Sequence, residues 1–423
     1  MQDIVVIGAG LSGSLAAIML HQRGFRVTVI DRYRSYPAEF RAEQLVGSQI
    51  AFLDSIGLMT SLITGSRIVP RARNFSLGKQ LSSVLAPHYG MPYQDIVQAL
   101  RNKLPSEVRF IVGRVTDIES GPISTVHLDD GQAVAAKLVV MATGLNTKLG
   151  KRLGVDYEMI SAKHSTTVGF DIRSPKCTPA ETSVLVYYGN DLQDGVDYLT
   201  VFPCKDVLRG NLFLYRDPLD PWVRQLRQTP RETLLEVLPA LADELGDFTI
   251  EHLQCRVSDV AVARRHQRDG LVLIGDAYQT PCPAAGTGIS RLLVDVERLT
   301  IHATRWFAAN DTSAEALRSY YNDAVKRRSD RAAIRVARFR RAISTNASPL
   351  WALQRQIVKA KRFAKYILHS TRDLIVRSGQ VMPRRAAKGS VPPLKSWLLS
   401  SPNAASTGMT PMSAAPDVVG GAS

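Results

Sequence analysis

The feature that most constrains the fold of this chain is a glycine-rich turn near its N-terminus. Residues 3–7 (DIVVI) predict a short buried strand, residues 8–13 (GAGLSG) form the turn, and residues 14–23 predict a helix. Residues 26–30 (RVTVI) predict a second strand, which leads into Asp31. A GxGxxG turn between a strand and a helix predicts a βαβ unit that binds a dinucleotide.

Each glycine of the turn meets a different steric demand. Gly8 permits the tight bend, Gly10 lets the backbone approach a pyrophosphate, and Gly13 lets the helix pack closely on the strand. The free N–H groups and the positive dipole end at the start of the helix favour phosphate oxygens. Asp31 lies where a carboxylate accepts hydrogen bonds from a ribose. The turn alone does not decide which dinucleotide is bound.

A second motif, far along the chain, indicates a flavin. Residues 271–274 (LVLI) predict a buried strand that leads into Gly275 and Asp276. An aspartate at a strand end can hold a ribityl hydroxyl. Gly286 and Gly288 then begin a helix whose N–H groups can face an electron-rich atom. This arrangement suits a flavin, because the reduced ring carries negative charge near N1 and O2.

With both motifs in place, residues 1 to about 300 resemble the class A flavoprotein monooxygenases of the para-hydroxybenzoate hydroxylase type. FRAEQL places Arg41 at the family arginine near the FAD phosphates or ribityl chain, and MPYQDIVQAL places Gln94 at a flavin-contacting glutamine. The motifs and the resemblance together assign FAD to Gly8, Gly10, Leu11, Ser12, Gly13, Asp31, Arg32, Arg41, Gln94, Thr143, Gly144, Asp276, Pro283, Gly286, Gly288 and Ile289.

The chain departs from the family pattern at several positions. Gln279 replaces the histidine that follows GDA, and Cys282 replaces the first proline of a pair. Against the family segment GADGxxSxxR, MATGLNTKLG places Thr143 at the aspartate and Gly150 at the arginine. In the family that segment touches FAD and is implicated in NAD(P)H handling, so the departure concerns the reduction step.

The resemblance implies a monooxygenase that uses FAD, with NAD(P)H as a transient co-substrate and O2. Reduced FAD would form a C4a-hydroperoxide that hydroxylates a small aromatic, polyketide-like or quinone-like substrate. The single GxGxxG fits transient docking of NAD(P)H, and it equally fits an enzyme that another protein reduces. No catalytic triad is legible, so no catalytic residue is assigned. The alternatives are an FAD-dependent reductase or dehydrogenase of the geranylgeranyl reductase type and a membrane- or partner-associated flavoprotein. A halogenase signature, WxWxIP, is not found.

The expected architecture is an α/β fold with a Rossmann-like FAD-binding domain and an inserted mixed or antiparallel β-sheet domain. Residues 1–160 and 266–310 would bind FAD, 161–265 would bind the substrate, and 311–390 would form basic helices. Residues 391–423 are rich in Ser, Ala, Pro and Gly and predict a disordered tail. The aromatic candidates for the substrate pocket are Tyr187, Tyr188, Tyr198, Phe202, Phe213 and Tyr215.

The net charge of +15 is concentrated in one segment. Residues 324–388 hold eighteen Lys and Arg against two Asp, so the rest of the chain is nearly neutral. Basic amphipathic helices can place an apolar face on the protein body and leave the bases in water, or they can contact an anionic membrane or an acidic partner. No nucleic-acid-binding motif accompanies the arginines, so nucleic acid is not expected as a partner.

Cysteine usage and hydropathy bear on the compartment. The four cysteines form no CxxC, so neither a metal site nor a disulfide framework is expected. No signal peptide and no spanning apolar run are visible. We therefore expect a cytoplasmic protein, either free or peripheral at the inner face of the membrane. The sequence leaves the oligomeric state open.

Overall fold

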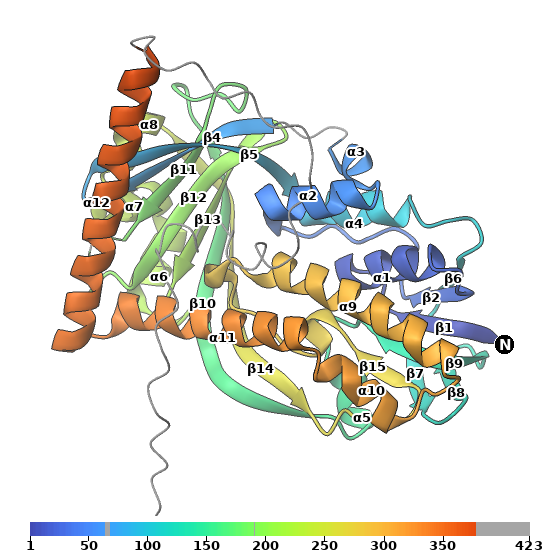
Figure 1. Cartoon of the computed structure of the whole chain (residues 1–423). Coiled ribbons are helices and arrows are strands. Elements are labelled where there is room, and N and C mark those ends of the chain that lie inside the picture. Colours follow the sequence, from blue (N-terminus) through green and yellow to red (C-terminus); the bar gives the residue numbers. More distant parts are fainter. Residues whose placement is uncertain (64–67, 190, 378–423) are drawn as a thin grey trace, which may run out of the picture.

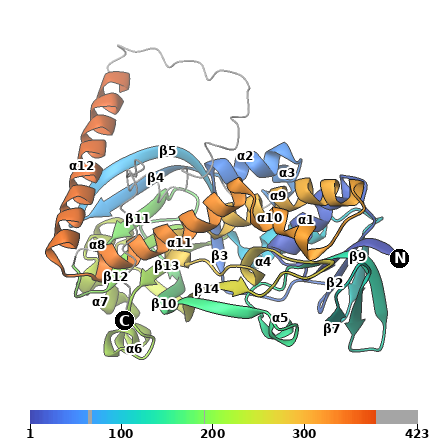
Figure 2. The same cartoon turned by 60° about the horizontal axis from the view of Figure 1, so that its bottom comes forward.

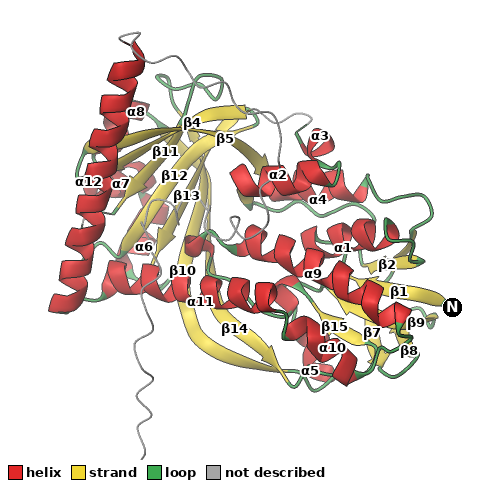
Figure 3. Ribbon diagram, viewed as in Figure 1, coloured by secondary structure: helices red, strands yellow, loops and turns green. Residues whose placement is uncertain are grey.

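The computed structural model describes residues 1–63, 68–189 and 191–377, which form two β-sheets with helices packed on both (Figure 1). Figure 3 shows one sheet beside the N-terminus and the larger sheet in the opposite half of the molecule. This arrangement confirms the α/β architecture with C-terminal helices that the sequence predicts. The tail predicted for residues 391–423 lies outside the described residues.

The first sheet is the βαβ unit extended by further strands. Its order is β6-β2-β1-β9-β8-β7, and β15 pairs with the end of β9. All pairs are parallel except β7–β8 and β8–β9. Its strands are β1 (Gln2–Ile7), β2 (Val27–Asp31), β6 (Arg109–Val112), β7 (Val115–Glu119), β8 (Ser124–Leu128), β9 (Ala133–Met141) and β15 (Leu271–Leu273).

The second sheet has eight strands in the order β14-β10-β13-β12-β11-β4-β5-β3. Its strands are β3 (Ala42–Val46), β4 (Ile68–Ser76), β5 (Lys79–Pro92), β10 (Asp156–Arg173), β11 (Val184–Tyr188), β12 (Val196–Cys204), β13 (Val207–Leu214) and β14 (Thr249–Arg264). Strands β11, β12 and β13 lie within residues 161–265, for which the sequence predicts an inserted sheet. Residues 161–265 supply only part of this sheet, because β4 pairs in parallel with β11 and brings β3 and β5 with it.

Helices cover the faces and edges of both sheets. They are α1 (Leu11–His21), α2 (Gly47–Ser55), α3 (Met59–Leu62), α4 (Tyr93–Arg101), α5 (Lys148–Arg152), α6 (Pro221–Gln228), α7 (Pro230–Val237), α8 (Ala240–Leu245), α9 (Gly288–Ala308), α10 (Ala314–Tyr321), α11 (Ala324–Thr345) and α12 (Pro349–Arg377). Two short 3-10 turns, η1 (Gly275–Ala277) and η2 (Pro283–Ala285), precede α9. Figure 2 shows α12 beside β4 and β5. Among the described helices, none has the length and apolar character needed to cross a membrane.

Strand β1 shows why the first sheet forms. Ile4 and Val6 pack into the core that contains α1 and α9, whereas Val5 and Ile7 pack into the core on the opposite face. A parallel strand covered on both faces needs such an unbroken apolar run. The same run holds the glycine-rich turn at the carboxyl end of β1 in a fixed position.

A cluster of four buried charges fixes α11 to α9. Arg291 Nη1 lies 3.0 Å from Asp295 Oδ2 and 3.4 Å from Asp330 Oδ1. Lys326 Nζ lies 2.6 Å from Asp295 Oδ1 and 3.0 Å from Asp330 Oδ2. Each carboxylate thus meets two cations in the interior. Removing one partner from such a set leaves a charge without compensation.

The basic C-terminal segment is therefore divided between the core and the surface. Lys326 and Arg340 are buried, and Ala333 and Ala337 pack against the protein body. The apolar side of α11 thus packs on the protein body, which is one of the alternatives that the sequence leaves open. Two basic residues of the helix, Lys326 and Arg340, are buried with it. The exposed arginines of α11 are Arg327, Arg328, Arg331, Arg335 and Arg338.

We predict that Lys326→Met lowers the free energy of unfolding by about 3–5 kcal/mol. The variant leaves two buried carboxylates with one cation, and burial already raises the pKa of Asp330. The loss should be largest well above that raised pKa and shrink as the pH falls toward it, because protonation removes the uncompensated charge. Urea unfolding at several pH values measures this.

Arg327→Met removes the same charge from an exposed position of α11 and is the matched control. Its stability should stay within about 0.5 kcal/mol of the unsubstituted protein. Equal losses in the two variants, or a loss in Lys326→Met that does not depend on pH, would contradict the structural role of the buried cluster.

Candidate cofactor and substrate site

Three motifs that are far apart in the sequence meet at the carboxyl edge of the first sheet. The turn after β1, the Ala142-Thr143-Gly144 segment after β9 and the GDA motif after β15 lie side by side, because these strands are parallel neighbours. A methyl group on Gly8 would lie 2.5 Å from the Ala142 carbonyl oxygen, and one on Gly275 would collide with the Ser12 hydroxyl. The edge at which the strand order reverses is where ligands bind in such sheets.

The glycine-rich turn has the geometry that the sequence predicts. Gly8 has φ +95°, a conformation that favours glycine. A methyl group on Gly13 would collide with the Gly8 carbonyl, so α1 can approach β1 only without a side chain there. A methyl group on Gly10 would meet nothing within 4 Å, so space remains where a pyrophosphate can approach.

The N-terminus of α1 is open to an anion. Gly10 is the N-cap, and no side chain caps the first turn. The Leu11 side chain is buried in the core, so at this position the backbone faces the site. Uncapped N–H groups at a helix N-terminus are donors for phosphate oxygens.

Asp31 is held in place by a residue that the sequence analysis did not identify. Asp31 Oδ2 accepts a hydrogen bond from the Ala9 N–H at 2.7 Å and lies 3.1 Å from Arg101 Nη2. The buried Arg101, at the end of α4, also donates to the Ala9 carbonyl at 2.7 Å and to the Tyr33 carbonyl at 2.6 Å. Arg101 therefore fixes the turn and Asp31 relative to each other. Arg32, in contrast, is exposed beside Tyr33.

Arg41 lies between the two motifs. Its guanidinium stacks on the Tyr93 ring at 4.0 Å, and its Nε lies 2.5 Å from Glu43 Oε1. Burial alone would lower the pKa of Arg41, but Glu43, Tyr93 and Asp276 raise it above its ordinary value. Burial also raises the pKa of Tyr93 to about 12. Arg41 therefore keeps its charge near Asp276.

Gln94 supports the segment before Arg41. Its Oε1 accepts a hydrogen bond from the Glu39 N–H at 2.7 Å, and the Tyr93 N–H donates to the Arg41 carbonyl at 2.8 Å. Asp276 lies 3.5 Å from Arg291 Nη2, which joins the GDA motif to the buried charge cluster. Gln94 and Arg41 are thus joined by neighbouring contacts, and the charge of Asp276 acts on Arg41.

The segment before α9 exposes two of its residues and buries the two between them. Ala284 and Ala285 are fully buried, whereas Pro283 and Gly286 are exposed, and Gly286 has φ +63°. The α9 helix starts at Gly288 without a side-chain cap, and its Ile289 side chain packs into the core. Thr287 Oγ1 is buried and has no hydrogen-bond partner. The Thr287 hydroxyl and the uncapped N–H groups of α9 can form hydrogen bonds with polar atoms at the edge of a bound ring.

Cys282, the departure from the family proline, is a core residue. Its thiol lies 3.3 Å from the Ser165 hydroxyl, and burial raises its pKa. Gln279, which replaces the family histidine, donates to the Asp330 carbonyl at 3.1 Å. Both residues serve local packing, and the structure gives neither a redox role.

The departure after β9 has a steric explanation. Thr143 donates its hydroxyl to the Asn146 carbonyl at 3.1 Å, and Gly144 has φ +60°, so these residues shape a turn. At Gly150, where the family pattern has arginine, any side chain would collide with the Tyr157 hydroxyl. Tyr157 thus occupies the space beside the position of the missing arginine, and its buried Oη has no hydrogen-bond partner.

The second sheet turns one aromatic face toward this site. Tyr188, Tyr198, Phe202 and Phe213 pack in the same core as Cys282 and Ala284, and Tyr215 borders that core. Tyr198 donates its hydroxyl to the Ala284 carbonyl at 3.0 Å. Tyr187 points to the opposite face and stacks on Phe75 at 4.6 Å. Tyr187 is therefore wrong as a pocket residue, because neighbouring residues of a strand face opposite sides.

The described geometry fits FAD on several independent counts. The space above Gly10, the uncapped N-termini of α1 and α9 and the orphaned Thr287 hydroxyl line one edge of the first sheet. No group of three or more His, Cys, Asp or Glu able to hold a metal occurs among the described residues. The site therefore offers hydrogen bonds, backbone dipoles and apolar surface.

Comparison with known proteins gives consistent findings. Residues 1–302 match the model of a family described as FAD binding domain. The 6-methylpretetramide 4-monooxygenase of Streptomyces rimosus is 25% identical over 312 residues, which cover 69% of this chain and 73% of the relative. Digeranylgeranylglycerophospholipid reductase 1 of Methanococcoides burtonii is 24% identical over 332 residues, covering 75% and 78%.

A solved structure shows the same fold over nearly the whole chain. The crystal structure of p-nitrophenol 4-monooxygenase PnpA from Pseudomonas putida DLL-E4 superposes with a TM-score of 0.67 at 18% sequence identity. The match covers 91% of this chain and 99% of that chain.

Two glycine variants should separate binding from folding. Gly10→Val places a side chain in open space and should leave the apoprotein stable to within about 0.5 kcal/mol. Its FAD affinity should fall at least about tenfold, because the side chain occupies the path of the pyrophosphate. Gly13→Ala should instead lower the free energy of unfolding by about 1–3 kcal/mol. Flavin fluorescence titration and urea unfolding distinguish the two.

Arg101→Met should weaken FAD binding, because it releases Asp31 and the glycine-rich turn from each other. Arg114→Met is the control, because it removes an exposed arginine that lies between β6 and β7 and pairs with Asp129. Unchanged FAD affinity in Arg101→Met, with a normal fold, would contradict the positioning role of Arg101.

Proposed function

Because the chain belongs to the FAD binding domain family and is a class A FAD-dependent monooxygenase, we propose that it hydroxylates a small aromatic, polyketide-like or quinone-like compound. The observation that carries the proposal is the aromatic face of the second sheet, which packs against the segment before α9. Tyrosine and phenylalanine side chains offer flat apolar surface to a ring system. The names of two relatives, which act on 6-methylpretetramide and p-nitrophenol, support this substrate class.

The residues of the chain bind, orient and exclude water, while FAD supplies the redox and oxygen chemistry when bound. We propose that Gly8, Gly10, Ser12, Gly13 and the backbone at Leu11 hold the pyrophosphate. Asp31, with Arg32 nearby, would hold the ribose. Thr143 and Gly144 would shape the adjoining wall of the site.

The reactive end of the cofactor would lie at the second motif. We propose that Asp276 and Arg41, with Gln94 behind it, hold the ribityl chain and its surroundings. Pro283, Gly286, Gly288 and the Ile289 backbone would border the ring. The N-terminal N–H groups of α9 would stabilise negative charge on the reduced ring, because a helix dipole is positive at that end.

The test follows the reduction and reoxidation of the bound flavin. Under argon, NADH or NADPH should bleach the flavin absorption of the purified protein, and O2 should restore it. A substrate of the proposed class should speed the bleaching and gain one oxygen atom, which isotopically labelled O2 identifies by mass spectrometry. Consumption of NAD(P)H with a hydrogenated, unlabelled product would favour the reductase alternative.

A flavin that neither nucleotide reduces would contradict the proposed use of NAD(P)H. The altered turn at Thr143 and the Tyr157 side chain beside Gly150 make this the step to examine first. Reduction with dithionite then distinguishes an oxygenase that uses another electron donor from a protein without oxygenase activity. Oxygen insertion into the substrate after dithionite reduction would indicate the oxygenase.

We also propose a peripheral contact of α12 with an anionic membrane. Leu350, Leu353 and Ile357 are 66%, 58% and 37% exposed and share one side of α12, while Val358 packs inward. An apolar stripe on a helix within a strongly basic segment fits a negatively charged lipid surface. Such a contact would give the enzyme access to lipophilic substrates.

Leu353→Glu should reduce sedimentation with phosphatidylglycerol vesicles about tenfold, because it removes apolar area and adds a repelled charge. Ala309→Glu adds the same charge at an exposed position after α9 and is the control. Equal binding of the two variants, or equal binding to neutral phosphatidylcholine vesicles, would contradict the contact.

A further inference from the structure

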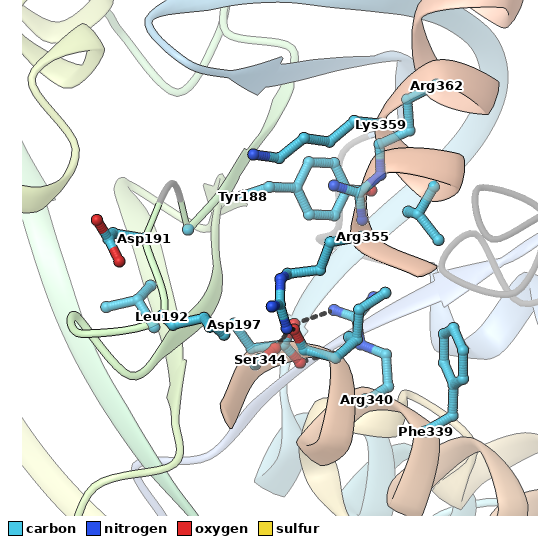
Figure 4. Close-up of a pocket in the computed structure, with 14 residues that line it drawn as sticks. Tyr188, Asp191, Leu192, Asp197, Phe339, Arg340, Ser344, Arg355, Lys359 and Arg362 are labelled. Atoms are coloured by element: carbon cyan, nitrogen blue, oxygen red, sulfur yellow. Dashed lines mark hydrogen bonds and ion pairs between the residues drawn. The ribbon is translucent and has the colours of Figure 1, made fainter. Parts of the chain in front are cut away.

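A small cavity lies between α11, α12 and the ends of β11 and β12, apart from the cofactor motifs (Figure 4). Its volume is about 70 Å³. Four basic residues line it, Arg340, Arg355, Lys359 and Arg362, against two acids, Asp191 and Asp197. A cavity needs roughly 10–15 Å³ to hold one water, so this cavity has room for a carboxylate, sulfate or phosphate group.

One of the two acids is already neutralised. Asp197 Oδ1 lies 2.9 Å from Arg340 Nη2, and Asp197 Oδ2 accepts from Arg340 Nε at 3.0 Å. The Tyr215 hydroxyl donates to the same carboxylate at 3.1 Å, and the Ser344 hydroxyl donates to it at 3.3 Å. At contact distance the charge of Asp197 is therefore matched by Arg340, and Asp197 acts on Arg362 only from farther away.

The second acid does not neutralise the cavity either. Asp191 Oδ1 accepts from the Gln193 N–H at 3.0 Å within its own exposed loop. Arg355 donates to the carbonyls of Ile343 and Asn346, which carry no net charge. Lys359 forms no ion pair with any described residue.

Among these residues, Arg362 gives the strongest indication of a bound anion. Its guanidinium lies over the Tyr188 ring at 3.5 Å, and its Nε is buried without a hydrogen-bond partner. Burial lowers the pKa of Arg362 and the neighbouring Arg340 lowers it further, although Tyr188 and Asp197 act in the opposite direction. Asp197 makes its ion-pair contact with Arg340, and no described carboxylate lies within ion-pair distance of Arg362. A buried guanidinium without an anion is costly unless a ligand compensates its charge.

We propose that this cavity is a binding site for an oxyanion, in which Arg362 and Lys359 are the principal donors and Arg355 assists. The Tyr188 ring orients the guanidinium plane, and the Asp197–Arg340 pair forms a neutral floor. Planar, bidentate recognition suits a carboxylate or phosphate. The anion is either a free inorganic ion or the acidic group of a larger ligand, including a lipid headgroup.

Contacts also link the cavity to the segment before α9, which we propose borders the flavin. Arg340 lies 4.6 Å from the centre of the Tyr198 ring, and Tyr198 donates to the Ala284 carbonyl at 3.0 Å. Occupancy of the cavity can therefore bear on the wall of the substrate site through two contacts. The proposal itself does not depend on the proposed hydroxylase reaction, because anion binding needs no turnover.

The experiment measures anion binding to the full chain loaded with FAD, at constant ionic strength. Inorganic phosphate and sulfate should raise the thermal midpoint in a saturable way and give heat in calorimetric titration, whereas chloride should do neither. Arg362→Met and Lys359→Met should each weaken phosphate binding at least tenfold. Arg338→Met, which removes the same charge from an exposed site on α11, should leave it unchanged.

The same variants provide a folding control. Without anion, Arg362→Met should be at least as stable as the unsubstituted protein, because it removes an uncompensated buried charge. Arg362→Lys should restore part of the binding. Benzoate and glycerol phosphate as competitors, and phosphatidylglycerol vesicles, then separate an acidic substrate group from a lipid headgroup.

Equal phosphate affinity in the unsubstituted protein, Arg362→Met and Arg338→Met would overturn the proposal, as would a chloride effect equal to that of phosphate. The flavin spectrum recorded on the same samples reports failure of the FAD assignment separately. Loss of flavin with retained phosphate binding would contradict the proposed function and leave the anion site standing.

Discussion

The structure depends on the close approach of three backbone segments at one edge of a parallel sheet. The Gly8 turn meets the carbonyl of Ala142, α1 meets that turn at Gly13, and Gly275 meets Ser12. These contacts have no room for side chains. They bring motifs that lie more than one hundred residues apart in the sequence to a single cofactor-sized edge. The buried apolar run of β1 keeps that edge rigid.

Ionic contacts then hold the surrounding elements in register with this edge. Arg101 connects α4 to Asp31 and the turn, and Arg291 connects the GDA motif to α9 and α11. The C-terminal helices are therefore structural parts of the protein rather than an appended basic tail. At its surface the same segment exposes arginines of α11 and an apolar stripe of α12, for which we propose a membrane contact. Buried and exposed cations of α11 thus differ in environment, and only the buried ones have structural partners in the core.

Much of the first sheet could be predicted from the sequence, because its signals are local. The GxGxxG turn, the strand before Asp276 and the glycines before α9 each follow from a short pattern. The contributions of Arg101 and Lys326 could not be predicted, since Asp31 and Asp295 lie 70 and 31 residues away from them. The local spacing of Lys326 and Asp330 does not show that this pair is buried. The sequence also did not show that β3, β4 and β5 belong to the second sheet, because the parallel pairing of β4 with β11 is a tertiary contact. For Tyr187 and Tyr188, aromatic composition identified the strand but not which residue faces the site.

The central claim is that the turn after β1, the segment around Arg41 and the segment from Gly275 to Ile289 form one FAD site. Hydrogen–deuterium exchange of the full chain with and without FAD tests it most directly, because protection reports each segment separately. The account predicts slower exchange at residues 8–14, 39–44 and 275–290 on FAD binding, with no change in α6–α8 on the far face of the second sheet. Protection confined to one of these segments, or protection centred on α6–α8, would contradict the account.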